Sequence, residues 1–309
     1  MKRFASILVD VDATAAVHPE LDRAASLARR CGARLTIVDS MTTVAHAHQL
    51  PSEIDENVVA SRRHRLARLA RLVPGTPAIS RLLVGQSATV LIQEVLRSNH
   101  DLLVRAHARD LTAASDHDGA VDEELLRKCP CPVLLVGPGR APDKPRIAGV
   151  VTGNEDQAED PLSMKVVDFM LSMARYEDGA PMLLQTWVPF AEHMIRTNSL
   201  DDAFAAYVEN TRRHTAGQLA EIKRSLGGML SDIRTISRRG KPEDIIPEFT
   251  VGQGIDLVVM AAPAPNGSIS GFLFGDASLR FLKKLTCSLL AVKPDGFVSP
   301  VRVPALELE

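Results

Sequence analysis

Apolar and polar positions along this chain follow two alternating periods. Short apolar runs predict buried strands at 7–9, 35–38, 79–84, 102–104 and 133–136. Between these runs, apolar residues recur every three or four positions, as at Leu21, Ala24 and Ala28, which is typical of a helix. The first half is therefore expected to alternate strands with helices, beginning and ending on a strand.

The second half of the chain repeats this order. Strands are predicted at 146–151, 181–186, 232–237, 256–261 and 288–292. Helices are predicted at 160–176, 199–227, 243–252 and 276–285. Strands that alternate with helices need crossover connections, which produce parallel sheets with helices on both faces. We expect an α/β protein with two tandem, doubly wound, parallel five-stranded sheets related by a pseudo-two-fold axis.

Two sequence matches support a duplication. The segment DLLVRA at 101–106 recurs as DLVVMA at 256–261, an offset of 155 residues. The segment at 128–138 recurs at 284–294, an offset of 156. The join lies among Pro142, Lys144 and Pro145. The predicted domains are therefore 1–140 and 145–298, followed by a tail at 299–309 that has no core pattern.

Composition narrows the functional classes. Of the 309 residues, 45% are hydrophobic and 24% are charged, as in globular proteins. The net charge of -2 produces no overall field that would attract nucleic acid or a membrane, and no apolar run approaches the roughly 18 residues of a spanning helix. The four cysteines do not form a disulfide framework, so we expect a reducing, cytoplasmic location.

Ligands of open α/β sheets bind beyond the carboxyl ends of the strands, where the strand order reverses. In the first half this rule selects Asp10, Asp12 and the loop from His107. In the second half it selects Thr152 and the loop from Ala262.

Three segments carry a resemblance to a known family. They are Val11-Asp12-Ala13-Thr14 after the first strand, the glycine-containing loop 266–275 (NGSISGFLFG), and the last strand and its end at 287–294. With them the chain resembles the universal stress protein family in its tandem, two-domain form, over nearly its whole length. The resemblance implies an adenine nucleotide alpha hydrolase-like, Rossmann-like fold. Some members bind ATP through a loop of the form Gly-x2-Gly-x9-Gly-Ser/Thr.

The second half departs from that ATP loop. Ala262 and Pro265 replace its first two glycines, and proline removes a backbone N–H donor. Asp276 replaces the Ser/Thr and places a carboxylate where phosphate charge would lie, although a bound Mg²⁺ could bridge the two. Gly267, Gly271 and Gly275 leave the loop pliable. ATP is therefore disfavoured but remains an alternative here.

The first half departs further, because its loop at 107–119 has one glycine and three aspartates. It keeps Asp12 at the position of the family's adenine-side Asp, where the second half has Thr152. We predict no cofactor. The candidate ligand cleft is assigned to Asp12, Thr152, Ala262, Gly267, Gly271, Gly275 and Asp276.

Other candidate sites have simpler interpretations. Cys129-Pro130-Cys131 is half of a zinc site, and its second thiol aligns with Cys287 at the start of a buried strand, which favours a structural role. The ligand-type residues at 46–48 and 116–118 lack a third convergent group. The arginines between 62 and 71 lack interleaved aromatic residues, which favours a solvated helix face over nucleic-acid binding. No metal site is predicted.

The last strands, 132–136 and 288–292, each leave an unpaired apolar edge. We predict that the two copies pair through these strands within one chain, with further homodimerisation left open. Without a nucleophile elbow or paired carboxylates, we predict a non-catalytic protein. The resemblance implies a stress-response protein that binds a small ligand or protein partner. The alternatives are an ATP-binding switch in the second domain and a hydrolase in which Asp276 or Asp12 positions water on a phosphate.

Overall fold

The computed structural model describes residues 3–41, 52–107, 116–138, 142–153, 161–198, 200–225, 227, 233–262 and 278–304. The chain divides into two compact units. The first unit comprises Met1–Pro142 and Ser288–Glu309, and the second comprises Asp143–Cys287.

The first unit is built on a sheet with the strand order β3-β2-β1-β4-β5-β10. Its elements are β1 (Ser6–Asp10), α1 (Pro19–Cys31), β2 (Arg34–Met41), α2 (Ser52–Leu72), β3 (Ala78–Val84), α3 (Ser87–Ser98), β4 (Leu102–Ala106), α4 (Asp116–Lys128), β5 (Val133–Val136) and β10 (Ser288–Val292). The first five strands in this order are parallel, and β10 pairs with β5 in the antiparallel sense, with Leu290 opposite Leu134. The strand order reverses between β1 and β4.

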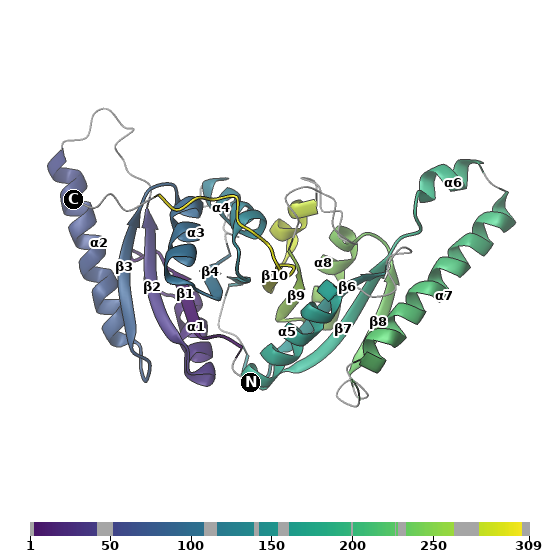
Figure 1. The fold of residues 1–309 in the computed structure, drawn as a ribbon, viewed down its shortest axis with the longest axis horizontal. Helices are drawn as coiled ribbons and strands as arrows, with labels where there is room; N and C mark the ends of the chain where they lie inside the picture. Colours follow the sequence, from purple (N-terminus) through teal and green to yellow (C-terminus); the bar gives the residue numbers. More distant parts are fainter. Residues whose placement is uncertain are drawn as a thin grey trace. The chain divides into compact units, whose positions relative to one another are not determined.

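Local sequence explains where α1 begins and ends. Pro19 occupies its first turn, Glu20 and Asp22 add negative charge there, and Arg29 and Arg30 add positive charge in the last turn. Gly32 ends the helix in the left-handed conformation with φ 65°, and its N–H bonds back to the helix. β1 and β5 are buried along their length, α3 packs against α4, and α2 lies along β3 at the edge of the sheet (Figure 1).

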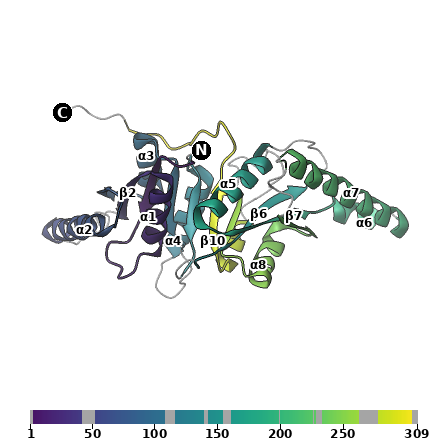
Figure 2. The same ribbon diagram turned by 90° about the horizontal axis from the view of Figure 1, so that it is seen from below.

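β10 and the residues after it are anchored in the first unit. The Ser288 hydroxyl accepts a hydrogen bond from Arg23 at 2.6 Å and another from the Gly137 N–H at 3.0 Å. Farther along, Gln93 of α3 donates to the Arg302 carbonyl at 3.1 Å, and Figure 2 shows this last segment running past α3. The final strand of the second repeat thus completes the sheet formed by the first.

The second unit has four parallel strands in the order β9-β6-β7-β8. Its elements are β6 (Arg146–Gly153), α5 (Pro161–Glu177), β7 (Ala180–Trp187), α6 (Glu192–Asn198), α7 (Asp201–Ser225), β8 (Arg234–Arg239), α8 (Pro242–Gln253), β9 (Leu257–Ala261) and the 3₁₀ helix η3 (Ser278–Lys284). The 25-residue α7, labelled in Figure 1, packs against β6 and β7 and buries only Thr211 and Thr215.

The strands occur where the sequence predicts them, and two helical assignments need correction. The predicted helix at 276–285 is a 3₁₀ helix over its described part, Ser278–Lys284. The short helix α6 was not anticipated, because its seven residues are too few for a clear period. None of the helices in the described part of the chain is long and apolar enough to cross a bilayer.

Candidate ligand site in the first unit

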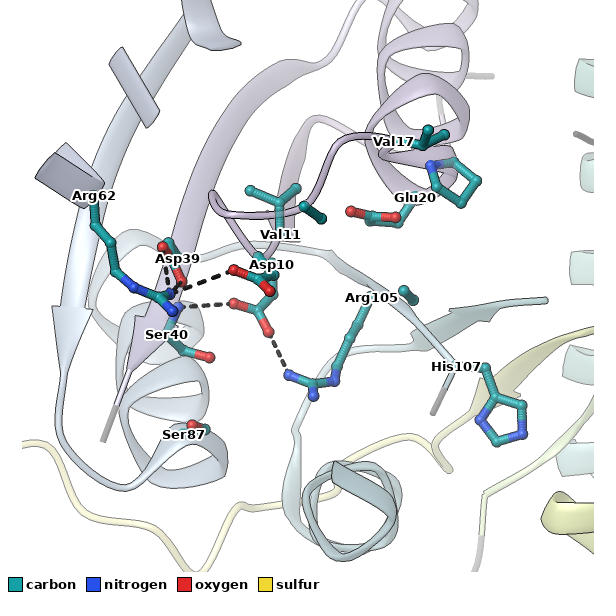
Figure 3. A pocket seen from close by; sticks show the side chains of 14 residues that line it. Asp10, Val11, Val17, Glu20, Asp39, Ser40, Arg62, Ser87, Arg105 and His107 are labelled. Carbon is teal, nitrogen blue, oxygen red and sulfur yellow. Dashed lines mark hydrogen bonds and ion pairs between the residues drawn. The ribbon is translucent and has the colours of Figure 1, made fainter. Parts of the chain in front are cut away.

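A cavity of about 380 Å³ opens at the carboxyl ends of β1, β2 and β4, where the strand order of the first unit reverses. This volume is within the range of small-molecule sites. The ionisable side chains on its wall are Asp10, Asp12, Glu20, Asp39, Arg62, Arg105 and His107. Figure 3 shows Asp10, Asp39 and Arg105 near the ends of these strands, with Glu20 on α1 and Arg62 on α2. The sheet topology therefore places an unusually charged pocket at the position expected for a ligand.

Asp10 and Arg105 form the centre of this charged network. They are register partners on the neighbouring strands β1 and β4, and Arg105 Nη1 lies 2.5 Å from Asp10 Oδ2 (Figure 3). The same guanidinium reaches Asp122 of α4 through Nε at 3.0 Å, and His107 Nδ1 lies 3.0 Å from the other Asp122 oxygen. Burial raises the pKa of Asp10 to about 6, although the Arg105 charge acts in the opposite direction.

A second ion-pair group connects α2 to the ends of β1 and β2. Arg62 Nη1 lies 2.8 Å from both Asp39 oxygens and 3.6 Å from Asp12 Oδ1. Burial raises the pKa of Asp39 against the effect of Arg62. Partial burial acts to raise the pKa of Asp12 as well, but hydrogen bonds from Thr14 and the charge of Arg62 outweigh it and lower that pKa. Arg62 therefore connects α2 to the ends of β1 and β2 through ion pairs on one side of the pocket.

Glu20 adds a third carboxylate environment from the first turn of α1. Its side chain is buried, and His18 Nδ1 lies 3.4 Å from its Oε1. Burial raises the pKa of Glu20, and the nearby Asp10 charge adds to this effect. The pocket wall thus contains four carboxylates, and its two arginines are already bound to some of them.

The register of the two sheets identifies the equivalent positions in the second unit. Ile7 opposes Leu102 across β1 and β4, and Ile147 opposes Leu257 across β6 and β9, so the repeats superimpose strand on strand. The Asp10–Arg105 pair then corresponds to Val150–Met260, which are also register partners. By the same register, Asp12 corresponds to Thr152 and Asp39 to Gln185. Every charged strand position of the first pocket is uncharged in the second unit.

Side chains of α7 occupy the end of β6 in the second unit. A Cβ on Gly153 would lie 2.6 Å from Thr215 Cγ2, so the helix packs directly on the glycine backbone. Gln185 donates to the Thr215 carbonyl at 2.8 Å and accepts a bond from Ser237 at 3.1 Å. This close packing leaves the strand ends covered by α7.

Comparison with known proteins agrees with this duplicated architecture. The profile described as the Universal stress protein family matches residues 3–137 and again residues 156–293. The chain belongs to the universal stress protein family.

Curated relatives and solved structures match nearly the whole chain. Universal stress protein E of Photorhabdus laumondii is 27% identical over 98% of this chain and 99% of its own length. Universal stress protein E of Escherichia coli K12 is 25% identical over 98% of both chains. The functionally unknown protein PA1789 of Pseudomonas aeruginosa has a TM-score of 0.64 at 20% identity, covering 95% of this chain and 94% of its own. A universal stress protein of Archaeoglobus fulgidus has a TM-score of 0.63 at 12% identity, covering 93% and 96%.

The structure brings only part of the sequence-predicted site together. Asp10, Asp12 and His107 line the pocket of this universal stress protein. In the second unit, Thr152 is half-buried at the end of β6 and Ala262 is buried after β9. Gly267, Gly271, Gly275, Asp276 and Pro265, with the histidines at 46–48, lie outside the described residues. The second half of the predicted cleft therefore stays a prediction.

Sequence reasoning missed Arg105, Arg62, Asp39, Glu20 and Asp122 as parts of the site. A usable signal exists for Arg105, because it is the one charged residue in the apolar run at 102–106 and its counterpart in the second repeat is Met260. Asp39 has a similar signal at the end of an apolar strand. Arg62 and Glu20 lie on helices of mixed polarity, where charge is ordinary and carries no such signal.

One buried arrangement resembles a hydrolase triad and has a structural explanation. Ser6 Oγ lies 2.9 Å from His100 Nδ1, and His100 Nε2 lies 3.8 Å from Glu94 Oε1. The hydroxyl is buried, and none of the three residues lines the pocket. Arg81 and Ser98 bind the same Glu94 oxygen, and His100, Ser98 and Arg81 together lower the pKa of Glu94 against the effect of burial. The hydrogen bonds and ion pairs of these residues connect β1, α3 and β3.

Among the described residues, no three His, Cys, Asp or Glu side chains are placed to hold a metal ion.

Proposed function

We propose that this universal stress protein is a non-catalytic, cytoplasmic stress-response protein that acts by binding. We assign the ligand to the pocket of the first unit and propose a small, polar molecule that is not a nucleoside triphosphate. The observation that carries the proposal is the internal pairing of charge in a pocket that still has about 380 Å³ of space. Location in a reducing compartment is supported by four buried, free cysteines.

Electrostatics disfavours a triphosphate in this pocket. Asp10, Asp12, Glu20 and Asp39 would face its negative charge, and each close contact between like charges costs on the order of 1 kcal/mol or more. Arg62 and Arg105 could offset that repulsion only by giving up their existing carboxylate partners. A neutral or zwitterionic molecule with several hydrogen-bonding groups requires no such exchange.

The last strands of the two repeats, β5 and β10, pair with each other. We propose that the antiparallel pairing of β10 with β5 serves in place of a homodimer, since it covers the edge that β5 would otherwise expose.

An ATP-binding switch in the second domain is the competing function, and the sequence of its loop, with Pro265 and Asp276, argues against it.

The test compares bound molecules in three forms of the full chain purified without added ligand. Ala106 at the mouth of the pocket is changed to Trp to block it, and the exposed Ala205 of α7 receives the same change as a control. Small molecules released on denaturation are identified by mass spectrometry. We expect a polar, non-triphosphate molecule from the wild type and from Ala205→Trp, and its loss from Ala106→Trp.

Added ATP separates the competing functions. At about 1 mM, ATP is expected to leave the melting temperature of the wild type within about 1 °C. A larger shift that survives Ala106→Trp would favour the second-domain switch. An ATP-induced shift in melting temperature that Ala106→Trp abolishes would overturn the proposed pocket function, because ATP would then bind in the first unit. The proposal would also fail if no small molecule were released on denaturation from any of the three proteins.

A further inference from the structure

Two cysteines lie together at the end of α4 in the first unit. Cys129 and Cys131 flank Pro130 in the short link between α4 and β5. Their sulfur atoms are 3.6 Å apart, and both side chains are buried as free thiols. Because the two sulfur atoms are already in van der Waals contact, a small movement would bring them to the S–S bonding distance of about 2 Å.

A buried lysine ammonium lies at the C-terminal end of α4, which leads directly into the thiol pair. Lys293 follows β10 and is 3% exposed, and its Nζ donates to the carbonyls of Leu126 and Arg127 at the end of α4. The ring of Phe297 lies 4.4 Å from the same nitrogen, a cation–π contact. Burial lowers the pKa of Lys293 to about 8, while the charges of the two thiolates act in the opposite direction.

The surroundings make the two thiols unequal. The hydrogen bond between them lowers the pKa of Cys129, with a further contribution from the Lys293 charge, and this outweighs the effect of burial. The same hydrogen bond, together with burial, raises the pKa of Cys131. One thiol is therefore set up to ionise first, with the other as its hydrogen-bond donor.

We propose that Cys129 and Cys131 form a reversible dithiol–disulfide couple that is oxidised by hydrogen peroxide or a similarly small hydroperoxide. The Cys129 thiolate attacks one peroxide oxygen, the O–O bond breaks, and the other oxygen leaves as water after taking up a proton. Cys129 is then a sulfenic acid, a two-electron oxidation product. The Cys131 sulfur attacks that sulfur, the S–S bond forms, and a second water leaves. Two thiols and one peroxide thus give one disulfide and two waters.

Lys293 acts as the positioning residue for this chemistry. Its ammonium is held in place by two carbonyls and an aromatic ring, so it stabilises the Cys129 thiolate on which the first step depends. The buried position restricts the oxidant to a small molecule, which suits a peroxide. A short-lived disulfide is also the form in which reducing compartments use such bonds.

The experiment uses the full chain with Cys31→Ala and Cys287→Ala, which leaves only the pair under study. After peroxide treatment and quenching, intact mass should fall by two hydrogen atoms, and a peptide map should show Cys129 joined to Cys131. Dithiothreitol should restore the mass. Adding Cys131→Ala should replace the mass loss by one added oxygen, which a 1,3-dione added during denaturation traps at Cys129.

A rate measurement tests the part played by Lys293. Lys293→Met should slow disulfide formation about tenfold, because one unit of thiol pKa changes the thiolate population by that factor. Lys144→Met, at an exposed lysine, is the matched control. Equal rates in the two variants would remove Lys293 from the proposal. Free thiols that resist peroxide in the parent protein, or that gain oxygen without a crosslink, would overturn it entirely, and this arm needs no Lys293 variant to fold.

Discussion

The carboxyl ends of the strands differ sharply between the two units, although the strands share one register. In the first unit, Asp10 and Arg105 face each other across β1 and β4, and the pocket beside them is lined by paired charge. In the second unit, Val150 and Met260 occupy the same register, and α7 packs on Gly153 at the end of β6. Ion pairs connect the strand ends of the first unit, and close packing of uncharged residues covers those of the second.

The fold does not require charge at these positions. The second unit forms the same parallel order of strands with an apolar pair at its centre. Replacing a buried ion pair by well-packed apolar residues is often neutral or stabilising, whereas removing one partner is costly. The charges of the first unit are therefore better explained by the pocket than by stability, and this can be tested by exchanging residues between the repeats.

The largest effect is expected from Arg105→Met, which installs the second unit's residue alone. Asp10 and Asp122 would lose their shared cation, and the first unit should lose about 3 to 5 kcal/mol at pH 7. Hydrogen exchange of the β1 and β4 amides measures this loss. Trp187, the single tryptophan, is buried in the second unit, so its fluorescence midpoint should stay unchanged.

The double variant Asp10→Val and Arg105→Met completes the exchange and serves as the control. It copies the apolar pair at 150 and 260 and should recover at least half of the lost stability. A double variant as unstable as Arg105→Met would show that the charged pair itself stabilises the first unit.

A second prediction concerns pH and the proton on Asp10. Its pKa in the folded protein is about 6, above its ordinary value of 3.8. The folded state therefore binds this proton more tightly, so the stabilisation is full below pH 4 and is lost as pH rises toward 6. Through Asp10, the first unit should therefore lose about 3 kcal/mol of unfolding free energy as the pH rises. Asp10→Asn should remove this fall in stability between pH 4 and 6, measured by urea unfolding at successive pH values.

The second unit supplies the reference for that measurement, because it has Val150 at the corresponding position. Tryptophan fluorescence should give the same pH dependence of the second unit in wild type and Asp10→Asn. If Asp10→Asn left the pH dependence of the first unit unaltered, Asp10 would not carry the proton assigned to it.

A third, smaller effect is expected from Gly153→Ala in the second unit. The new methyl group would lie 2.6 Å from Thr215 Cγ2 and 2.8 Å from its Cβ, so α7 must shift. Overpacking of this kind costs about 1 to 3 kcal/mol, and the neighbouring Trp187 should report it directly by fluorescence. Gly217→Ala in α7 is the control, because a Cβ there meets open space and should stabilise the helix by about 1 kcal/mol. Equal responses would mean that α7 does not close this strand edge.

Much of the fold follows from the sequence, because strand periods and a 155-residue repeat are strong local signals. The rule for parallel sheets also places Asp10, Asp12 and His107 at the pocket without a structure. What the sequence could not supply is the pairing of distant charges. Arg62 reaches Asp39 from a helix whose arginines look alike, and Arg105 reaches Asp122 across a loop. Burial and partner choice depend on tertiary packing, which periodicity does not encode.

The smallest expected effects have opposite signs at one pair of equivalent positions, Ser40 and Thr186. The Ser40 hydroxyl favours the ionised form of Asp10, to which the Ser40 N–H donates at 3.1 Å, whereas the Thr186 hydroxyl is fully buried and has no hydrogen-bond partner among the described residues. Thr186→Val keeps the shape and removes an unsatisfied polar group, so it should stabilise the second unit by about 1 kcal/mol. Ser40→Ala should destabilise the first unit by about the same amount, because a bond to a charged group is lost. For Thr186→Val, the urea unfolding midpoint of the second unit is measured by tryptophan fluorescence. For Ser40→Ala, the stability of the first unit is measured by amide hydrogen exchange. A loss of stability in Thr186→Val would reveal a partner for that hydroxyl, such as a bound water, and the second strand edge would then be polar rather than closed by packing.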